Sequence, residues 1–272
     1  MRLGLGLDLR KTLVAGGPSY DPDALTWFET VEASGANFGP DPATANANKM
    51  AWSNWVIAQK NAESPIAGRS NWDQLTEPGQ GFIQPLMGLS TFNVPPLFGG
   101  STFTGFVSGD HVPAMGLKGG DGKVLLANRN WNGTPLNNMS AGIWVTGLGG
   151  DTINRIFGTS LSTTSTIFIE DARVRMRSST ITASGDNFAA GSVPRSAFVS
   201  RHSAAEYQVH NGSLFTVGVP SVGEVSTAVA FFNGESLGFP STIRGGLAFY
   251  GRSINLEAMN TACIALSEAI VW

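Results

Sequence analysis

The sequence predicts a mainly β protein, an antiparallel β-sandwich of the jelly-roll type that follows a short helical hairpin. Beyond about residue 100, short strand-like runs are separated by turn residues at about every 8 to 12 positions, as in sandwiches and barrels. Residues 21–62 instead carry two helix start signals, and a Pro/Gly-rich stretch follows them. A chain of 272 residues is long enough for one large β domain with a small accessory segment.

Residues 1–20 are expected to form an extended docking peptide. Leu3, Leu5 and Leu7 alternate with glycines, so an extended chain would present the three leucines on one face. Asp8 and the basic residues after it interrupt this run too early for a secretory signal. Such a peptide can add to the edge of a partner's sheet or fill its groove, and a tail without fixed structure is the alternative.

Residues 21–63 are expected to form a helical hairpin. Asp21-Pro22 and Asp41-Pro42 each place a capping carboxylate before a proline at the first helical position. The aromatic face of the second helix must be covered by the neighbouring helix, the β domain or another subunit. The apolar residues at helical spacing are Leu25, Phe28 and Val31 in the first helix and Met50, Ala51, Trp52, Trp55 and Val56 in the second.

Residues 64–100 are expected to be a connector, because five prolines forbid long regular elements there. Residues 101–272 form the predicted jelly-roll domain, whose last element is a helix. The predicted strands are 123–127, 142–146, 152–158, 166–170, 173–178, 197–201, 206–210, 214–219, 225–232 and 246–250.

Turn residues support the prediction of paired strands. Asn211-Gly212 lies between two alternating runs, and Asn-Gly favours the turn whose twist matches that of a hairpin. Asp121-Gly122 and Asn233-Gly234 predict further tight turns.

The chain closes with a predicted helix over about residues 255–270. Its apolar stripe is expected to pack on a sheet or on a neighbouring copy. Because the chain has a single cysteine, no internal disulfide can form. The stripe consists of Leu256, Met259, Cys263, Leu266 and Ile270.

The low charge of the chain predicts assembly. Charged residues make up 14% of the sequence, against about 25% in ordinary soluble domains. Surfaces so poor in charge promote association, so we expect a homo-oligomer or a place in a larger particle. The net charge of −3 argues against nucleic-acid binding, which needs clustered Lys and Arg. No run of 18 apolar residues is present, so membrane insertion is not expected.

Three passages, 116–130, 199–213 and 246–255, resemble laminin-G-like and concanavalin-type jelly rolls in virion proteins of tailed bacteriophages and prophages. The helical pair and the Leu-Gly peptide are similar to those proteins as well. The resemblance implies a fibre, spike or tail-tip protein that recognises a glycan or envelope, a virion location and, by analogy, a homotrimer. The family supplies no fixed binding residues.

Motifs for catalysis are missing from the sequence. Jelly-roll glycosidases place two carboxylates on one strand in the pattern Glu-x-Asp-x-x-Glu, which does not occur here. Neither a nucleophile elbow nor a zinc or phosphate-binding motif occurs. His202 and His210 fall in the region of the Asn-Gly hairpin, where surface histidines are the ordinary interpretation. The sequence therefore predicts no enzyme, no catalytic residues, no metal and no cofactor.

Two candidate binding sites remain, and the first is a row of arginines. Arg173, Arg175 and Arg177 alternate with apolar residues, so three guanidinium groups would share one strand face. Acidic polysaccharide or lipopolysaccharide phosphate would suit that row. A solvated face or ion pairs between subunits are the alternatives.

The second candidate site is a polar loop around one aromatic residue. Asn128, Arg129, Trp131 and Asn132 have the composition expected where a sugar stacks on an indole and its hydroxyls bond to amides. A loop that merely packs on its neighbour is the alternative.

These observations predict a virion structural protein that docks on other virion proteins by its N-terminus and presents a lectin-like jelly roll to host-surface polysaccharide. Three alternatives stay open. They are a decoration or stabilising protein without glycan binding, a polysaccharide-degrading enzyme on the same fold, and a free cytosolic lectin.

Overall fold

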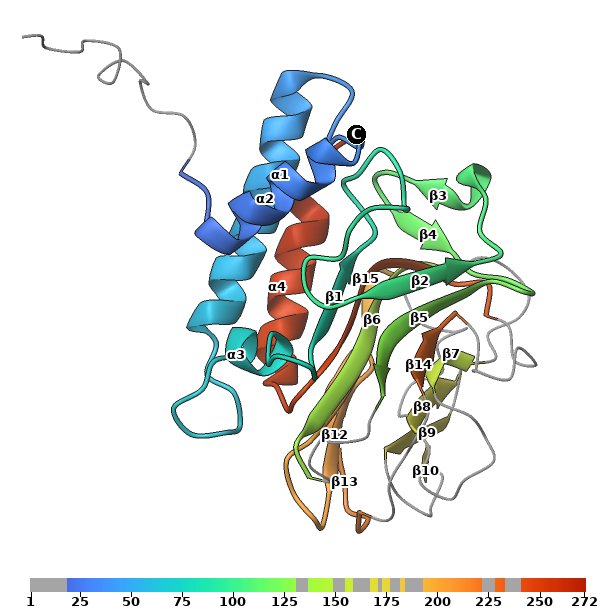
Figure 1. Cartoon of the computed structure of the whole chain (residues 1–272). Helices are drawn as coiled ribbons and strands as arrows, with labels where there is room; N and C mark the ends of the chain where they lie inside the picture. Colours follow the sequence, from blue (N-terminus) through green and yellow to red (C-terminus); the bar gives the residue numbers. More distant parts are fainter. Residues whose placement is uncertain are drawn as a thin grey trace, which may run out of the picture.

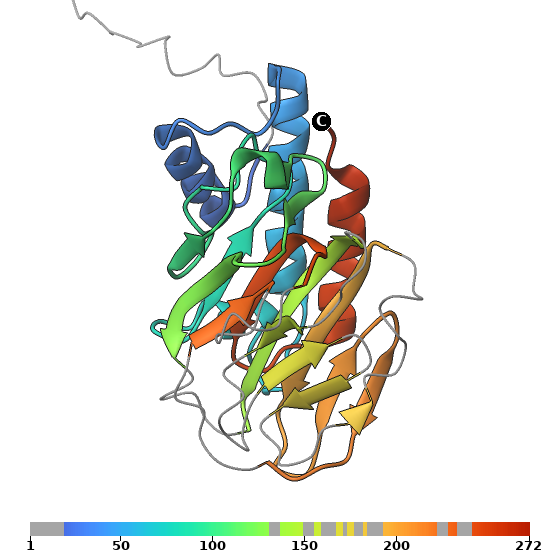
Figure 2. The same ribbon diagram turned by 90° about the vertical axis from the view of Figure 1, so that its right-hand side faces the viewer.

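The computed structural model describes residues 19–130, 137–148, 155–158, 167–170, 173–176, 182–183, 193–221, 228–232 and 241–272. Two antiparallel sheets face each other, and helices cover the outer side of one of them (Figure 1). Figure 2 views the same arrangement with the second sheet toward the reader and the long helices behind. The predicted class, a mainly β protein with two sheets in a sandwich, is confirmed.

The first sheet contains eight strands in the order β13-β12-β11-β6-β15-β4-β3, and β1 also pairs with β15. One edge of β15 pairs with β6, while the other edge pairs first with β4 and then with β1. The strands are β1 (Phe82–Pro85), β3 (His111–Val112), β4 (Gly116–Lys118), β6 (Met139–Gly147), β11 (Arg195–Arg201), β12 (Tyr207–His210), β13 (Leu214–Val217) and β15 (Arg244–Gly251).

The second sheet contains seven strands in the order β10-β9-β8-β7-β14-β5-β2. Each of the predicted strands has a counterpart in one of the two sheets. The strands are β2 (Ser101–Thr104), β5 (Val124–Asn130), β7 (Arg155–Gly158), β8 (Ile167–Glu170), β9 (Arg173–Met176), β10 (Thr182–Ala183) and β14 (Ala228–Phe231).

The two faces of the first sheet pack against different layers. In β6, Ala141, Ile143 and Val145 enter the core between the sheets, whereas Trp144 lies in the core beneath the helices. The same alternation places Phe198 of β11 on the helical side. Because side chains alternate along a strand, one sheet can serve both cores, and the molecule has three layers.

Helices form the third layer, and α2 lies beside α4 against the first sheet (Figure 1). Asp21 and Asp41 cap α1 and α2 with their carboxylates, each before a proline, as predicted. Gly35, with φ +85°, follows the end of α1. The helices are α1 (Pro22–Ala33), α2 (Pro42–Asn61), α3 (Asn71–Leu75) and α4 (Leu256–Ala269), and a 3-10 turn, η2, covers Ser108–Asp110.

The buried face of α1 matches the prediction at Phe28 and Val31 but not at Leu25. Leu25 is 42% exposed, whereas Ala24 and Trp27 are buried. The Trp27 ring packs edge-on against Phe38 and Trp52, at 5.3 and 5.7 Å between centroids, and these contacts fix the rotation of the helix. The stripe of α4 is buried as predicted, and burial raises the pKa of the Cys263 thiol to about 12.

The segment expected as a connector, 64–100, contributes elements to both cores. Its strand β1 pairs with β15 over four residues, and Phe82 and Ile83 enter opposite cores. Pro85 stands at the end of β1. The connector prediction missed this strand because a short run buried on both faces has no alternation of apolar and polar residues.

The turns are of two kinds. Asn211-Gly212 joins β12 to β13 with φ +78° at the glycine, which confirms the predicted hairpin. Gly122 also has a positive φ, but its turn leads from β4 in the first sheet to β5 in the second, so it forms no hairpin. Asn233-Gly234 lies outside the described residues. Within the described ranges, no helix combines the length and hydropathy that a membrane span needs.

Candidate functional site: a groove around Trp72

A groove of about 730 Å³ opens between the end of α2, the loop 62–71 and α3. Backbone hydrogen bonds close the base of this loop, from Ser64 N to Arg69 O at 2.9 Å and from Asn71 N to Ala62 O at 2.8 Å. Gly68, with φ +73°, makes the tight turn at its tip. The loop therefore has a defined shape and forms one wall of the groove.

The start of α3 fixes the position of Trp72. The Asp73 carboxylate accepts hydrogen bonds from the backbone N and the Oγ of Ser70, both at 2.8 Å, and Asp73 N donates to Ser70 Oγ. This capping box holds the first turn in which Trp72 stands. The bonds from Ser70 also hold the pKa of the Asp73 carboxyl below its usual range, although partial burial opposes them.

Lys60, in the last turn of α2, lies over the Trp72 ring, with Nζ 5.5 Å from the ring centroid. Its ammonium group bonds to Asp21 at 2.8 Å and to Asp23 at 2.7 Å. Partial burial lowers the pKa of Lys60, but the bonds from the two carboxylates outweigh it, so the pKa is raised. The contacts join the start of α1 to the end of α2 and leave the ammonium fully engaged.

Trp72 also lines a second hollow of about 300 Å³, which shares Asp23 with the groove. Its other walls carry two threonines of α1, Thr26 and Thr30, and the apolar residues Pro96 and Leu97. The half-buried indole thus stands between a polar space and a less polar one. A fixed aromatic ring beside convergent polar groups is the composition of sites that bind sugars.

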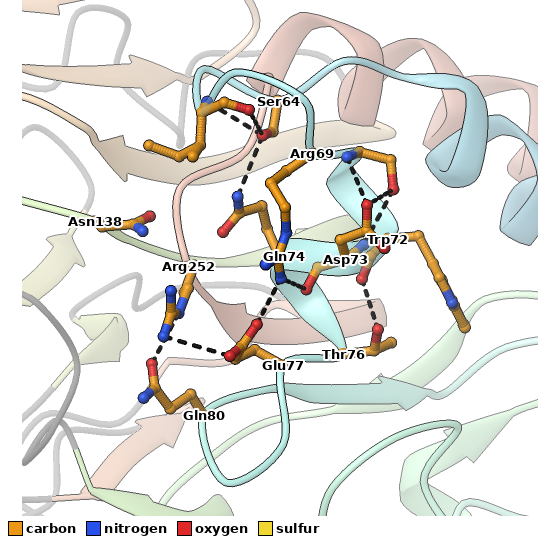
Figure 3. Close-up of polar contacts among 12 residues, drawn as sticks. Ser64, Arg69, Trp72, Asp73, Gln74, Thr76, Glu77, Gln80, Asn138 and Arg252 are labelled. Carbon is orange, nitrogen blue, oxygen red and sulfur yellow. Dashed lines mark hydrogen bonds and ion pairs between the residues drawn. The ribbon is translucent and has the colours of Figure 1, made fainter.

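An ion-pair network anchors the loop from behind (Figure 3). Glu77 accepts from Arg69 Nη2 at 2.5 Å, and its other oxygen lies 3.4 Å from Nη2 of Arg252. Arg252 Nε in turn donates to Gln80 at 3.0 Å. Since Arg252 directly follows β15, the network fastens the loop to the sheet.

Two buried polar atoms next to the groove have no protein partner. They are Arg69 Nε, a donor, and Gln74 Oε1, an acceptor. Gln74 is 1% exposed, and its amide nitrogen donates to Ser64, which lines the groove. Buried polar atoms are rarely left unpaired, and ordered water is the usual partner of such atoms behind a groove wall.

A second polar cluster, Ser196, His210 and Glu257, has the order of a nucleophile, a base and an acid. Ser196 Oγ bonds to His210 Nδ1, and His210 Nε2 lies 3.2 Å from Glu257. Ser196 and His210 are almost fully buried, whereas Glu257 is exposed, so a substrate could reach only the acid. The cluster ties the first turn of α4 to the sheet, and the prediction that His210 is a surface residue is wrong.

The predicted sites lie in the second sheet, away from the groove. Asn128 and Arg129 stand on β5, and Arg173 and Arg175 stand on β9, with β14, β7 and β8 between them. The structure therefore does not bring the two sites together. The other predicted site residues lie outside the described residues: Leu3, Leu5, Leu7, Trp131, Asn132 and Arg177.

A signal for the groove was present in the sequence. Ser70 and Asp73 have the spacing of a capping box, and Trp72 stands between an asparagine and an aspartate. Because residues 64–100 were interpreted as a connector, this helix start was not predicted. Among the described residues, no group of three or more His, Cys, Asp or Glu side chains could hold a metal ion.

Comparisons with known proteins give a distant likeness. No family model and no curated protein matches the sequence. Among solved structures, Trypanosoma rangeli sialidase matches at 11% identity with a TM-score of 0.47, over 82% of this chain and 38% of the sialidase chain. The same sialidase in complex with sialic acid matches at 11% identity with a TM-score of 0.45, over the same shares. This chain thus spans well under half the length of the sialidases it matches.

These matches correct one prediction. The sequence predicted that the chain is not an enzyme, but the solved structures it resembles are sialidases, so that prediction is withdrawn. At this identity and TM-score the likeness assigns neither an activity nor a substrate to this chain.

Proposed function

We propose that this chain is a structural protein of a bacteriophage particle, of the fibre, spike or tail-tip type, which binds a host-surface glycan in the groove around Trp72. The single observation that carries the glycan-binding part is the half-buried Trp72 indole, which a capping box holds between a polar groove and a less polar hollow. The part of this indole that Lys60 leaves uncovered can pack on the apolar face of a sugar ring while nearby polar groups bond to its hydroxyls.

Rigidity of the walls supports this choice of site. The loop 62–71 is closed by its own backbone bonds and anchored through Glu77 to Arg252. A preformed site loses little conformational entropy on binding, so a modest set of contacts suffices for useful affinity.

The virion part of the proposal is supported by the sequence. The surface is poor in charge, which favours burial in an assembly, and the three passages within 116–130, 199–213 and 246–255 resemble phage jelly rolls. In this proposal the two sheets form a laminin-G or concanavalin-like jelly roll. Leu3, Leu5 and Leu7 dock on other virion proteins. The copies assemble as a homo-oligomer, which is a trimer by analogy with the phage virion proteins that the sequence resembles.

Glycan binding is tested with a glycan array and the Trp72→Ala variant. We expect the wild-type chain to bind a subset of glycans and Trp72→Ala to lose about tenfold or more in affinity, as for a buried aromatic anchor. Trp272→Ala is the matched control, because Trp272 is 44% exposed and lines neither hollow. Equal binding by the wild type and Trp72→Ala would refute the site.

The virion role is tested by the protein content of purified particles. Mass spectrometry should find this chain in intact phage, and its absence from particles would refute the role. Incubation of the purified chain with host polysaccharide distinguishes binding from degradation. Shortening of the polysaccharide would assign a degrading enzyme on this fold in place of a binding protein.

A further inference from the structure

We propose that the Trp72 groove accepts neutral sugar chains and rejects acidic ones. This inference rests on the proposed function and names the class of glycan that the site can hold. A neutral glycan differs from the acidic polysaccharide that would suit the arginines of β9.

The cations in the groove are engaged by carboxylates of the chain. Among the described residues that line it, Lys60 and Arg69 are the cations, and both are already paired. Lys60 bonds to Asp21 and Asp23, and Arg69 bonds to Glu77. A carboxylate or phosphate on a ligand would have to displace one of these carboxylates before it gained a charge-assisted bond.

The walls of the groove carry more negative than positive side chains. Three carboxylates, from Asp23, Glu63 and Asp73, line the groove against the two engaged cations. Glu63 is exposed at the rim of the loop. The field in the groove is therefore negative, which repels an anionic sugar and leaves a neutral one unaffected.

Neutral polar side chains also line the groove, namely Asn61 and Ser64. A sugar hydroxyl can both donate to and accept from such groups, whereas a carboxylate can only accept. The half-buried Trp72 ring adds a stacking face that needs no charge.

The experiment measures binding of the full chain to an array that holds neutral, sialylated, uronic-acid and phosphorylated glycans. We expect Trp72-dependent binding to neutral glycans, with affinity that changes less than about twofold between 50 and 500 mM NaCl, because neutral ligands are not screened by salt. The variant Glu63→Lys, which reverses one exposed charge at the rim of the groove, should gain binding to acidic glycans relative to the wild type.

The outcomes separate the two proposals. Trp72-dependent binding of acidic glycans by the wild type, weakened by salt, would overturn the preference for neutral sugars and leave the proposed glycan-binding function standing. Binding of no glycan in a Trp72-dependent way would overturn both. If Glu63→Lys gains no binding to acidic glycans, the electrostatic explanation is overturned.

Discussion

Asn48 of α2 and Val271 after α4 hold each other by two hydrogen bonds across 223 residues of sequence. Asn48 Nδ2 donates to Val271 O at 2.7 Å, and Asn48 Oδ1 accepts from Val271 N at 2.9 Å. The same amide nitrogen donates to Phe38 O at 2.6 Å. One buried side chain thereby joins the loop after α1, the middle of α2 and the C-terminal end of the chain.

Asn48→Ala should therefore destabilise the fold. Three hydrogen bonds are lost and the buried Phe38 carbonyl is left without this donor, so we expect the free energy of unfolding to fall by about 2 to 3 kcal/mol. Urea denaturation measures this difference. Asn54→Ala, an exposed position on the same helix, is the control and should change the stability by less than about 0.5 kcal/mol. Equal effects of the two variants would contradict the role given to Asn48.

Gly142 of β6 lies against two aromatic rings on the helical side of the first sheet. A Cβ at this position would lie 2.5 Å from Cδ1 of Phe198 and 2.7 Å from Cζ of Phe249, so both rings would have to move. We expect Gly142→Ala to lower the free energy of unfolding by about 1 to 3 kcal/mol through overpacking. Gly109→Ala is the control, because a Cβ there meets nothing within 4 Å. A Gly142→Ala protein as stable as Gly109→Ala would show that the rings yield freely.

The sequence predicts the regular strands of the sandwich well because their signals are local. The apolar runs in β11 and β15 and the Asn-Gly turn after β12 each lie within a few residues, so they can be recognised in a single pass. The strand β1 could not be recognised in this way. Its four residues are all buried, and what makes them a strand is pairing with β15 more than 150 residues later.

The groove was not predicted for a related reason. Its capping box is local and visible, but its walls come together through contacts between distant segments. Lys60 reaches Asp21 across 39 residues, and Arg252 reaches Gln80 across 172. Polar groups that pair over such separations leave no recognisable spacing in the sequence. The arginine row and the Trp131 loop could be recognised because their residues lie close together in the sequence. Sequence patterns therefore reveal local sites more readily than sites that the fold assembles from distant segments.

Two buried histidines should make the protein less stable in mild acid. Burial lowers the pKa of His210, against the opposing effect of Glu257, and nearby Arg195 lowers it further. Burial also lowers the pKa of His111, with Arg244 acting in the same direction. The unfolded chain then binds protons before the folded one does. Stability should be complete above pH about 6.5 and decline as the pH falls through the folded pKa values.

The measurement is the free energy of unfolding against pH from 7.5 to about 5, a range that brackets the ordinary histidine pKa. His210→Gln removes one of the two groups, so its stability should depend less steeply on pH than that of the wild type. His202→Gln, on the same side of the molecule but only half-buried, should keep the steeper dependence. The groups that face His210 are Ser196, Glu257 and Arg195, and none of them changes in either variant. Identical pH profiles for the wild type and His210→Gln would rule out this source of acid sensitivity.

Glu77 should control how firmly the wall of the groove is held. Its carboxylate bonds to Arg69 in the loop 62–71 and lies 3.4 Å from Arg252 beside β15, so Glu77→Ala removes the anchor while the backbone bonds of the loop remain. Opening of the loop exposes the peptide bond after Arg69 to trypsin. Since cleavage of a native protein follows the population of the open form, we expect several-fold faster cleavage at Arg69 in Glu77→Ala. Glu63→Ala, which removes an exposed carboxylate from the same loop, should leave the rate near that of the wild type. Peptide mapping by mass spectrometry identifies the site of cleavage. If trypsin first cuts at another site, or cuts both variants at equal rates, the loop is anchored by contacts outside the Glu77 network.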